Sequence, residues 1–297
     1  MVMELQRKRT AADTVILLIL LLCAAACLIP LFNTLAISLS DKASAQSGRV
    51  FVWPVNFTAA PYGELMKDTQ FFRSFMISVQ RVLLGGGVNM LLTILSAYPL
   101  SKSPGQFRAK NKYMWFFILL MLFNGGMVPT FVLVSSLGLI NSIWALVLPG
   151  AVPIFNCIVL MNYYKTIPAS LEEAALIDGA GPWDILLRIY VPLSKASIAV
   201  TMLWAIVGHW NEFFSGIIYM TNKRNYPLQT YIQSLSVSVD WQNINWMKGE
   251  DISRMMSVSN LTFTSAKVVV SMIPILCIYP FLQRFFVTGI VMGAVKE

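Results

Sequence analysis

The chain has 297 residues, of which 57% are hydrophobic and only 12% are charged. Soluble domains carry about 25% charged residues, so this composition excludes an ordinary soluble protein and indicates a protein embedded in lipid. The net charge of +8 comes from basic residues scattered between apolar runs, without the basic stripe that a nucleic-acid interface requires. We therefore attribute the positive charge to membrane orientation and expect no nucleic-acid partner.

The first predicted span covers residues 14–37, and a basic cluster at residues 7–9 precedes it. About 20 apolar residues suffice to cross the hydrocarbon core. A signal peptide is the alternative, because Ala24–Cys27 faintly resembles a lipoprotein processing site, but the apolar stretch continues to residue 37 and is longer than a signal core. We therefore expect an uncleaved span with its N-terminus in the cytoplasm.

A second span is predicted at residues 75–100, and the loop after it, residues 101–112, contains four basic residues and no acidic one. The positive-inside rule places this loop in the cytoplasm. Arg81 lies within the span, where it either snorkels to the outer headgroups or lines a wet interior, and we favour snorkelling.

The third and fourth spans, residues 113–134 and 140–164, flank a short outer turn at Gly138. Several helix breakers lie in or next to them, which indicates broken or closely packed helices. These breakers are Asn124, Gly125, Gly126, Pro129, Pro149 and Pro153.

A charged, glycine-marked segment at residues 167–192 follows on the cytoplasmic side. Ser170 and Glu173 have the spacing of a capping box, which predicts the start of a helix. Gly179 is the residue type that ends a helix in the left-handed conformation, and Pro182 suits the first turn of a second helix. The pattern predicts a helix, a turn and a helix.

This segment resembles the EAA signature of the permease subunits of bacterial ABC importers. Glu173-Ala174-Ala175, Gly179 and Ile189-Tyr190-Val191-Pro192 stand at the offsets of that signature, with valine where the family usually has leucine. The resemblance implies that the segment couples the membrane spans to an ATPase subunit. The residues assigned to this coupling site are Leu171, Glu172, Glu173, Ala174, Ala175, Asp178, Gly179, Ala180 and Pro192.

The fifth span is predicted at residues 196–220 and the last at residues 263–286, with an outer polar segment, residues 221–262, between them. Polar and ionisable groups at membrane depth face a cavity or one another, so they are candidates for the translocation path. These candidates are Arg81, His209, Trp210, Asn211, Glu212 and Lys267. For His209 and Glu212, a hydrogen-bonded pair that packs the bundle and a direct role with substrate both remain open.

Two other classes of function compete with an importer subunit. One is an enzyme in which His209 and Glu212, three residues apart, share a catalytic metal, but His209 is the only histidine and the chain has no His-Glu-x-x-His sequence. The four cysteines also lack the spacing of a zinc site, so we expect neither an enzyme nor a metal site. The second alternative is an uncoupled channel or secondary transporter, with Arg81, Glu212 and Lys267 as an ion pathway.

Two more stretches resemble the carbohydrate-uptake, maltose-permease-like branch of this family, namely residues 210–214 and the tail from Leu282 to Lys296. Residues 124–130 resemble permeases for complex polysaccharides. The resemblance implies an all-α, polytopic membrane protein of about six helices, with residues 1–297 as a single permease domain of the type I importer fold. It also implies oligosaccharide import. The two cations at membrane depth, Arg81 and Lys267, give the hypothesis that the substrate is an acidic sugar.

The same resemblance implies the partners and the location. The partners are a second homologous permease, two ATPase subunits and an extracytoplasmic solute-binding protein, all working at membrane lipid. The phosphate-binding sequence Gly-x-x-x-x-Gly-Lys-Ser/Thr is absent from this chain, so ATP and magnesium are expected on the ATPase and no cofactor on the chain itself. The expected location is the bacterial inner membrane, with both termini in the cytoplasm.

Overall fold

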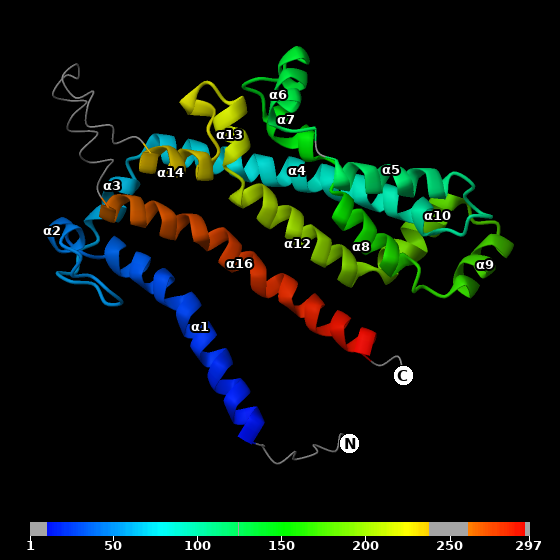
Figure 1. Ribbon diagram of the computed structural model, residues 1–297, viewed down its shortest axis with the longest axis horizontal. Helices are drawn as coiled ribbons and strands as arrows, with labels where there is room; N and C mark the ends of the chain where they lie inside the picture. The colour runs from blue at the N-terminus through cyan, green and yellow to red at the C-terminus, as the bar shows by residue number, and fades with distance from the viewer. Residues whose placement is uncertain (1–10, 124, 238–260, 295–297) are drawn as a thin grey trace. The chain divides into compact units, whose positions relative to one another are not determined.

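A computed structural model describes residues 11–123, 125–237 and 261–294, and these residues form helices, turns and loops without a strand. The longer helices are α1 (Ala11–Ser38), α4 (Thr69–Ser101), α5 (Lys110–Leu122), α6 (Met127–Ser136), α8 (Ile154–Tyr164), α9 (Ala169–Ile177), α12 (Lys195–Asn211), α14 (Leu228–Val237) and α16 (Leu261–Ala294) (Figure 1). The shorter ones are α2 (Lys42–Gln46), α3 (Ala60–Leu65), α7 (Ile143–Val147), η1 (Leu148–Gly150), α10 (Pro182–Ile185), η2 (Leu186–Tyr190), α11 (Val191–Leu193), α13 (Phe214–Tyr219) and η3 (Lys223–Asn225). The predicted all-α class is confirmed.

Three of these helices are long and apolar enough to cross a membrane, at Ala12–Ser38, Thr69–Ser101 and Leu261–Ile278. Three bent pairs meet the same requirement: Lys110–Leu122 with Met127–Ser136, Ile143–Gly150 with Ile154–Tyr164, and Pro182–Leu193 with Lys195–Asn211. The described chain therefore has up to six spans, in agreement with the predicted number.

The helix bounds differ from the predicted spans where the backbone breaks. Residues 113–134 are not one straight helix, because α5 and α6 meet at an angle of 112°. Gly126 just before α6 has φ +86°, a conformation that glycine adopts at little cost. Residues 196–220 are likewise divided, since α12 ends at Asn211 and α13 begins at Phe214.

The described residues form two compact units, and the single permease domain predicted over residues 1–297 stays a prediction. Unit 1 consists of the described parts of residues 1–69 and 235–272, and unit 2 of residues 70–234 and 273–297. In unit 1 the end of α1 is fixed to the loop after α2, because Asn33 Nδ2 donates to the carbonyl oxygens of Val50 at 3.2 Å and Phe51 at 2.7 Å.

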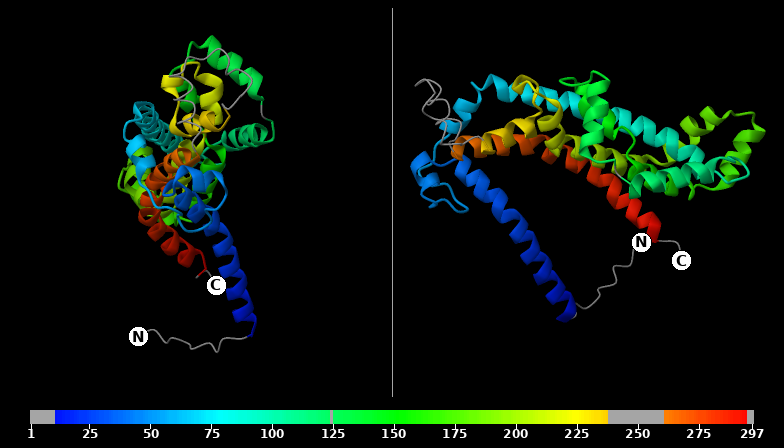
Figure 2. Two further views of the ribbon diagram at one scale, coloured as in Figure 1. Left: turned by 90° about the vertical axis from the view of Figure 1, so that its left-hand side faces the viewer. Right: turned by 45° about the horizontal axis from the view of Figure 1, so that its top comes forward.

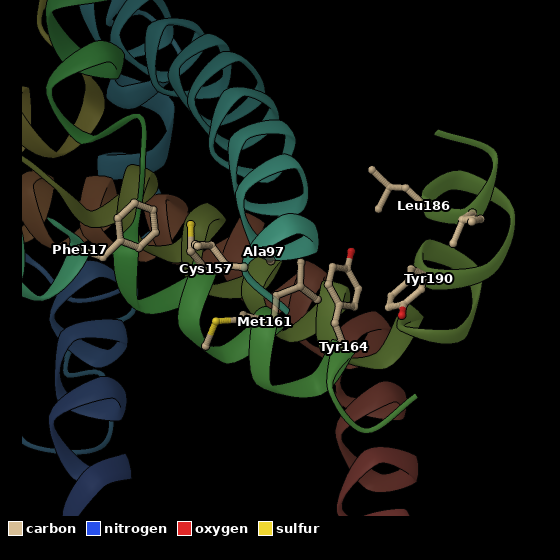
Figure 3. Packing of buried hydrophobic residues seen from close by; sticks show 10 residues of the cluster. Ala97, Phe117, Cys157, Met161, Tyr164, Leu186 and Tyr190 are labelled. Atoms are coloured by element: carbon tan, nitrogen blue, oxygen red, sulfur yellow. The ribbon is translucent and has the colours of Figure 1, made fainter. Parts of the chain in front are cut away.

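The core of unit 2 joins α4, α5 and α8 to the helices that follow α9 (Figure 3). Its buried members are Ala97, Leu100, Phe117, Cys157, Leu160, Met161, Tyr164, Ile185, Leu186 and Tyr190. Burial of a large apolar side chain stabilises a fold by about 1.5–3 kcal/mol. The helices that carry Ile185 and Tyr190 are therefore held to the membrane helices by apolar packing.

Candidate functional site

The segment at residues 167–192 folds as the predicted helix, turn and helix, but its first helix starts differently. α9 begins at Ala169 after Pro168, and no side chain caps its N-terminus, so the predicted capping box of Ser170 and Glu173 is wrong. Ser170 already lies in the first turn, where its hydroxyl cannot act as the N-cap. The predicted turn is confirmed, because Gly179 has φ +81° and Pro182 opens α10.

One face of this segment presents apolar and acidic side chains to the solvent. Ile177 is 88% exposed and Trp183 is 64% exposed, and Glu173, Ala174 and Asp178 are also exposed. Figures 1 and 2 show α9 at one end of unit 2, near the loop between α4 and α5. Exposed apolar groups rimmed by charges are typical of protein docking surfaces. Residues 173–183 therefore have the chemistry of a protein contact.

Glu172 differs from its neighbours because its side chain turns toward the membrane helices. Its Oε2 accepts from Lys102 Nζ at 2.7 Å and from the hydroxyl of Tyr190 at 2.7 Å. Lys102 Nζ also donates to the Tyr190 hydroxyl at 3.1 Å. Among the nine residues assigned to the coupling site, Glu172 thus makes polar contacts inside this chain, and Ala175 and Ala180 pack against the core of unit 2.

A second polar site occupies the middle of unit 2, where Arg81 of α4 meets the break between α12 and α13. Its Nη2 lies 2.6 Å from Glu212 Oε2 and 3.0 Å from Ser215 Oγ, and its Nη1 donates to the carbonyl oxygen of Glu212 at 2.9 Å. The break leaves this carbonyl without a helical partner, and the guanidinium supplies one. Arg81 is only 3% exposed, so the preference for snorkelling is wrong.

His209 is placed beside this ion pair and is bonded to Asn89 of α4. The His209 Nε2 and Asn89 Oδ1 atoms are 2.7 Å apart, and Asn89 Nδ2 donates to the carbonyl oxygens of Gly150 and Ala151, each at 2.8 Å. Gly150 ends η1 and Ala151 begins the break between η1 and α8. α4 therefore provides polar side chains that satisfy the backbone at two broken helices.

The pair of Arg81 and Glu212 and the pair of His209 and Asn89 both line a cavity of about 520 Å³ in unit 2. Its polar and aromatic lining consists of Arg81, Asn89, Asn156, Trp204, His209, Glu212, Ser215 and Tyr219. Two candidates for the path lie outside this lining. Trp210 is buried with its ring packed edge-on against Phe75, and Asn211 is exposed.

Lys267, the remaining candidate, belongs to unit 1. Its Nζ lies 2.7 Å from Asp68 Oδ2 and 4.1 Å from the ring centroid of Phe263, and its side chain is fully buried. The structure therefore does not place Lys267 in the polar site that contains Arg81, His209 and Glu212.

Comparison with known proteins identifies the kind of molecule that contains these two sites. The family described as binding-protein-dependent transport system inner membrane component matches residues 89–292. The chain belongs to this family. It is a permease subunit of an ABC importer, as the resemblance of the EAA signature implies, and the family assignment makes it a transport subunit.

The permease has relatives that match almost its entire length. It is 35% identical over 292 residues to the polygalacturonan/rhamnogalacturonan transport system permease protein YtcP of Bacillus subtilis (strain 168), covering 97% of this chain and 99% of that protein. Protein LplC of the same organism is 34% identical over 269 residues, covering 91% and 89%. The crystal structure of a bacterial ABC transporter that imports the acidic polysaccharide alginate matches with a TM-score of 0.83 and 28% identity, covering 94% of this chain and 99% of that chain.

The described parts of the permease contain no group of three or more His, Cys, Asp and Glu side chains that would hold a metal. His209 and Glu212, which define the alternative of a metal hydrolase, are each bonded to other partners, Asn89 and Arg81.

Sequence reasoning did not find every member of the two sites. It missed Asn89, Asn156, Trp204, Ser215 and Tyr219 of the polar and aromatic cavity lining, and Lys102 as the partner of Glu172. Asn89 carried a signal, because an amide in the middle of an apolar span needs a hydrogen-bond partner. Lys102 has no such signal in the sequence, since a buried lysine in a basic loop has the same sequence context as its exposed neighbours.

Proposed function

We propose that this permease imports oligosaccharides that contain uronate sugars, together with a second homologous permease, an ABC ATPase dimer and an extracytoplasmic binding protein. The observation that carries the substrate class is the pair of full-length matches to proteins named for acidic polysaccharides, polygalacturonan and alginate. Galacturonate and alginate chains share a carboxylate on each sugar ring and many hydroxyls. The proposed location is the bacterial inner membrane with both termini in the cytoplasm.

The polar cavity of unit 2 suits the hydroxyl groups of such a substrate. Asn89, Asn156, His209 and Ser215 offer amide, imidazole and hydroxyl groups, and the rings of Trp204 and Tyr219 line the same space. Few oriented polar groups in a mostly apolar pocket are typical of small-ligand sites. We assign these side chains to the translocation path, with the second permease completing it.

Energy enters through the exposed face of α9, which docks on one ATPase subunit. ATP and magnesium bind on that partner, and this chain holds no cofactor. A ligand shifts a conformational equilibrium only by its differential affinity for the two states. The ATPase dimer closed by ATP must therefore bind one state of the permease pair more tightly, and the packed core of unit 2 transmits that preference to the membrane helices.

The test is co-purification from detergent-solubilised membranes, comparing the intact chain with a variant that carries Glu173→Lys and Gly179→Val. The second permease is expected with both chains, and the ATPase only with the intact one. Valine is strained at the φ of +81° that Gly179 adopts, whereas asparagine tolerates the left-handed region. A second variant that carries Gly179→Asn alone should therefore retain the ATPase.

The chain itself offers a matched control. Glu64→Lys with Gly138→Val makes the same two chemical changes, at an exposed glutamate and at a glycine with φ +68°. This control should keep the ATPase. If no ATPase accompanies even the intact chain, the alternative of an uncoupled channel or secondary transporter replaces the importer proposal.

A further inference from the structure

Lys102 is a buried cation whose ion pair does not belong to the cavity and is not part of the exposed face of α9. Its side chain is 9% exposed, and Glu172 opposite is 12% exposed. Lys102 Nζ, Glu172 Oε2 and the Tyr190 hydroxyl are mutually within 3.1 Å, so each of the three groups bonds to the other two. The ammonium also lies 4.0 Å from the ring centroid of Tyr98 and 4.2 Å from that of Tyr190.

These contacts connect three separate parts of unit 2. Lys102 follows the last turn of α4, Glu172 lies in the first turn of α9, and Tyr190 ends η2. Figure 3 shows Tyr190 facing Tyr164 at the edge of the apolar core, and their ring centroids are 5.3 Å apart. The hydrogen-bonded group of Lys102, Glu172 and Tyr190 therefore contacts the apolar core through Tyr190 and α9 through Glu172.

α9 needs such an attachment because its own packing is slight. None of its residues is fully buried, and Ala175 is its only member that packs against the core of unit 2 among the described contacts. A methyl group contacts too little surface to fix the rotation of a helix. Glu172 and Ala175 are three residues apart and so lie on one face, whereas Glu173, Ala174 and Ile177 lie on another.

We propose that Lys102, Glu172 and Tyr190 form a latch that makes α9 move as one body with the cytoplasmic end of α4. This proposal rests on the docking of α9 on an ATPase subunit. The ATPase contacts the face with Glu173 and Ile177, and the latch on the opposite face transmits the displacement to the helix that carries Arg81 and Asn89. Lys102, Glu172 and Tyr190 are thus positioning residues for energy coupling.

Stability alone does not explain this arrangement. Taking a lysine and a glutamate out of water costs several kcal/mol per charge, and apolar residues of similar size often hold a fold equally well. Directional bonds differ from apolar packing because they fix one orientation of the helix. The latch therefore affects the ratio of ATP hydrolysed to sugar transported more than it affects assembly.

The test measures this ratio in proteoliposomes that contain the whole complex, with its binding protein and a labelled galacturonate oligosaccharide. The variants are Lys102→Met, Glu172→Gln and Tyr190→Phe, each first checked for co-purification of the ATPase. We expect the ATPase to remain bound, and the ATP used per sugar to rise roughly tenfold for the first two variants. Tyr190→Phe keeps the ring and loses only the hydroxyl, so its ratio should rise about threefold.

Three further variants serve as controls. Lys112→Met removes an exposed cation from the first turn of α5, and Tyr98→Phe removes the hydroxyl from the other ring that contacts Lys102. Both should leave the ratio unchanged. Lys102→Arg retains a cation that can pair with Glu172 and should restore most of the coupling.

The outcomes separate the latch from the proposed function. If the ATPase accompanies every variant and the ratio stays at its original value in Lys102→Met and Glu172→Gln, the latch is overturned while the docking of α9 stands. If Glu172→Gln loses the ATPase, Glu172 is a docking contact and the latch is again overturned. If the intact complex contains no ATPase, the importer proposal itself fails.

Discussion

Gly85 and His209 approach each other so closely that the helix has no room for a side chain at position 85. A Cβ atom built there would lie 2.5 Å from both Cε1 and Nε2 of the imidazole. Contacts this short force one of the two groups to move. The position of His209 in the cavity therefore depends on the absence of a side chain on the facing helix.

Replacement of Gly85 by alanine is expected to displace His209 and break its 2.7 Å contact with Asn89. Overpacking of this kind costs about 1–3 kcal/mol, which exceeds the gain of up to about 1 kcal/mol from replacing a helical glycine by alanine. Thermal unfolding of the purified complex should show the loss, and sugar uptake should fall with it.

Gly87→Ala is the matched control for this change, because nothing lies within 4 Å of a Cβ at position 87 of the same helix. The control should be as stable as the unchanged protein or slightly more so. Equal stability of both variants would show that His209 moves aside without cost, and would contradict the assigned role of this close approach.

At the scale of the element, Lys102 gives α9 a dependence on pH. Burial lowers the pKa of Lys102 below its ordinary value of 10.5, and the hydrogen bond and charge of Glu172 offset only part of this effect. The rings of Tyr98 and Tyr190 also contact its ammonium, and Lys110 Nζ donates to its backbone carbonyl oxygen. Lys102 therefore loses its charge, and with it the ion pair, at a lower pH than an exposed lysine does.

Stability and energy coupling should respond in opposite ways as the pH rises from the lowered pKa of Lys102 to its ordinary value of 10.5. In this interval the unfolded chain binds a proton that the folded chain has released, so the contribution of Lys102 to the free energy of unfolding rises with pH. Coupling falls over the same interval because the neutral amine no longer pairs with Glu172. The ratio of ATP hydrolysed to sugar transported, measured against pH, checks this expectation.

Arginine stays charged throughout this range, so Lys102→Arg should abolish the part of the pH dependence that belongs to the latch. Lys112 provides the control, since it is an exposed lysine for which the described residues show no contact with the latch. Lys112→Arg should leave the pH profile as it was. If the two arginine variants had the same profile as the unchanged permease, the titration of Lys102 would not govern coupling.

Sequence reasoning succeeded at the elements whose signals are local. Gly179 predicted a turn because few other residues adopt its φ of +81°. The length of the apolar runs predicted the membrane spans. The start of α9 was misjudged because Pro168 fits the N-cap geometry without a side-chain bond, so the Ser170 and Glu173 pair was not needed. A local signal does not reveal which of two adjacent glutamates turns inward, since that depends on Lys102, 70 residues away in the chain.

At the scale of the whole molecule, the described cations at membrane depth are already paired. Arg81 bonds to Glu212 within unit 2, and Lys267 bonds to Asp68 within unit 1. The sequence-based idea that these two cations receive an acidic sugar did not foresee these carboxylates, which lie far from them in the chain. We infer that preference for uronates, if imposed by this chain, comes from its oriented polar groups rather than from a free positive charge.

The substrate class is tested by competition in the reconstituted complex. Uptake of a labelled galacturonate oligosaccharide should be inhibited by unlabelled galacturonate and alginate oligosaccharides, and at least about tenfold more weakly by a neutral galacto-oligosaccharide of equal length. A difference of tenfold corresponds to about 1.4 kcal/mol in binding free energy. Equal inhibition by the neutral chain would contradict import selective for uronates.

The variant Lys267→Met with Asp68→Asn then asks whether the buried pair of unit 1 contributes to this preference. Lys267 is fully buried and bonded to Asp68, so removal of both charges should lower uptake of acidic and neutral chains equally or not at all. If only the uptake of acidic oligosaccharides fell, Lys267 would belong to the translocation path. Because the binding protein is the same in every measurement, such a change would belong to the permease and not to the delivery of the sugar.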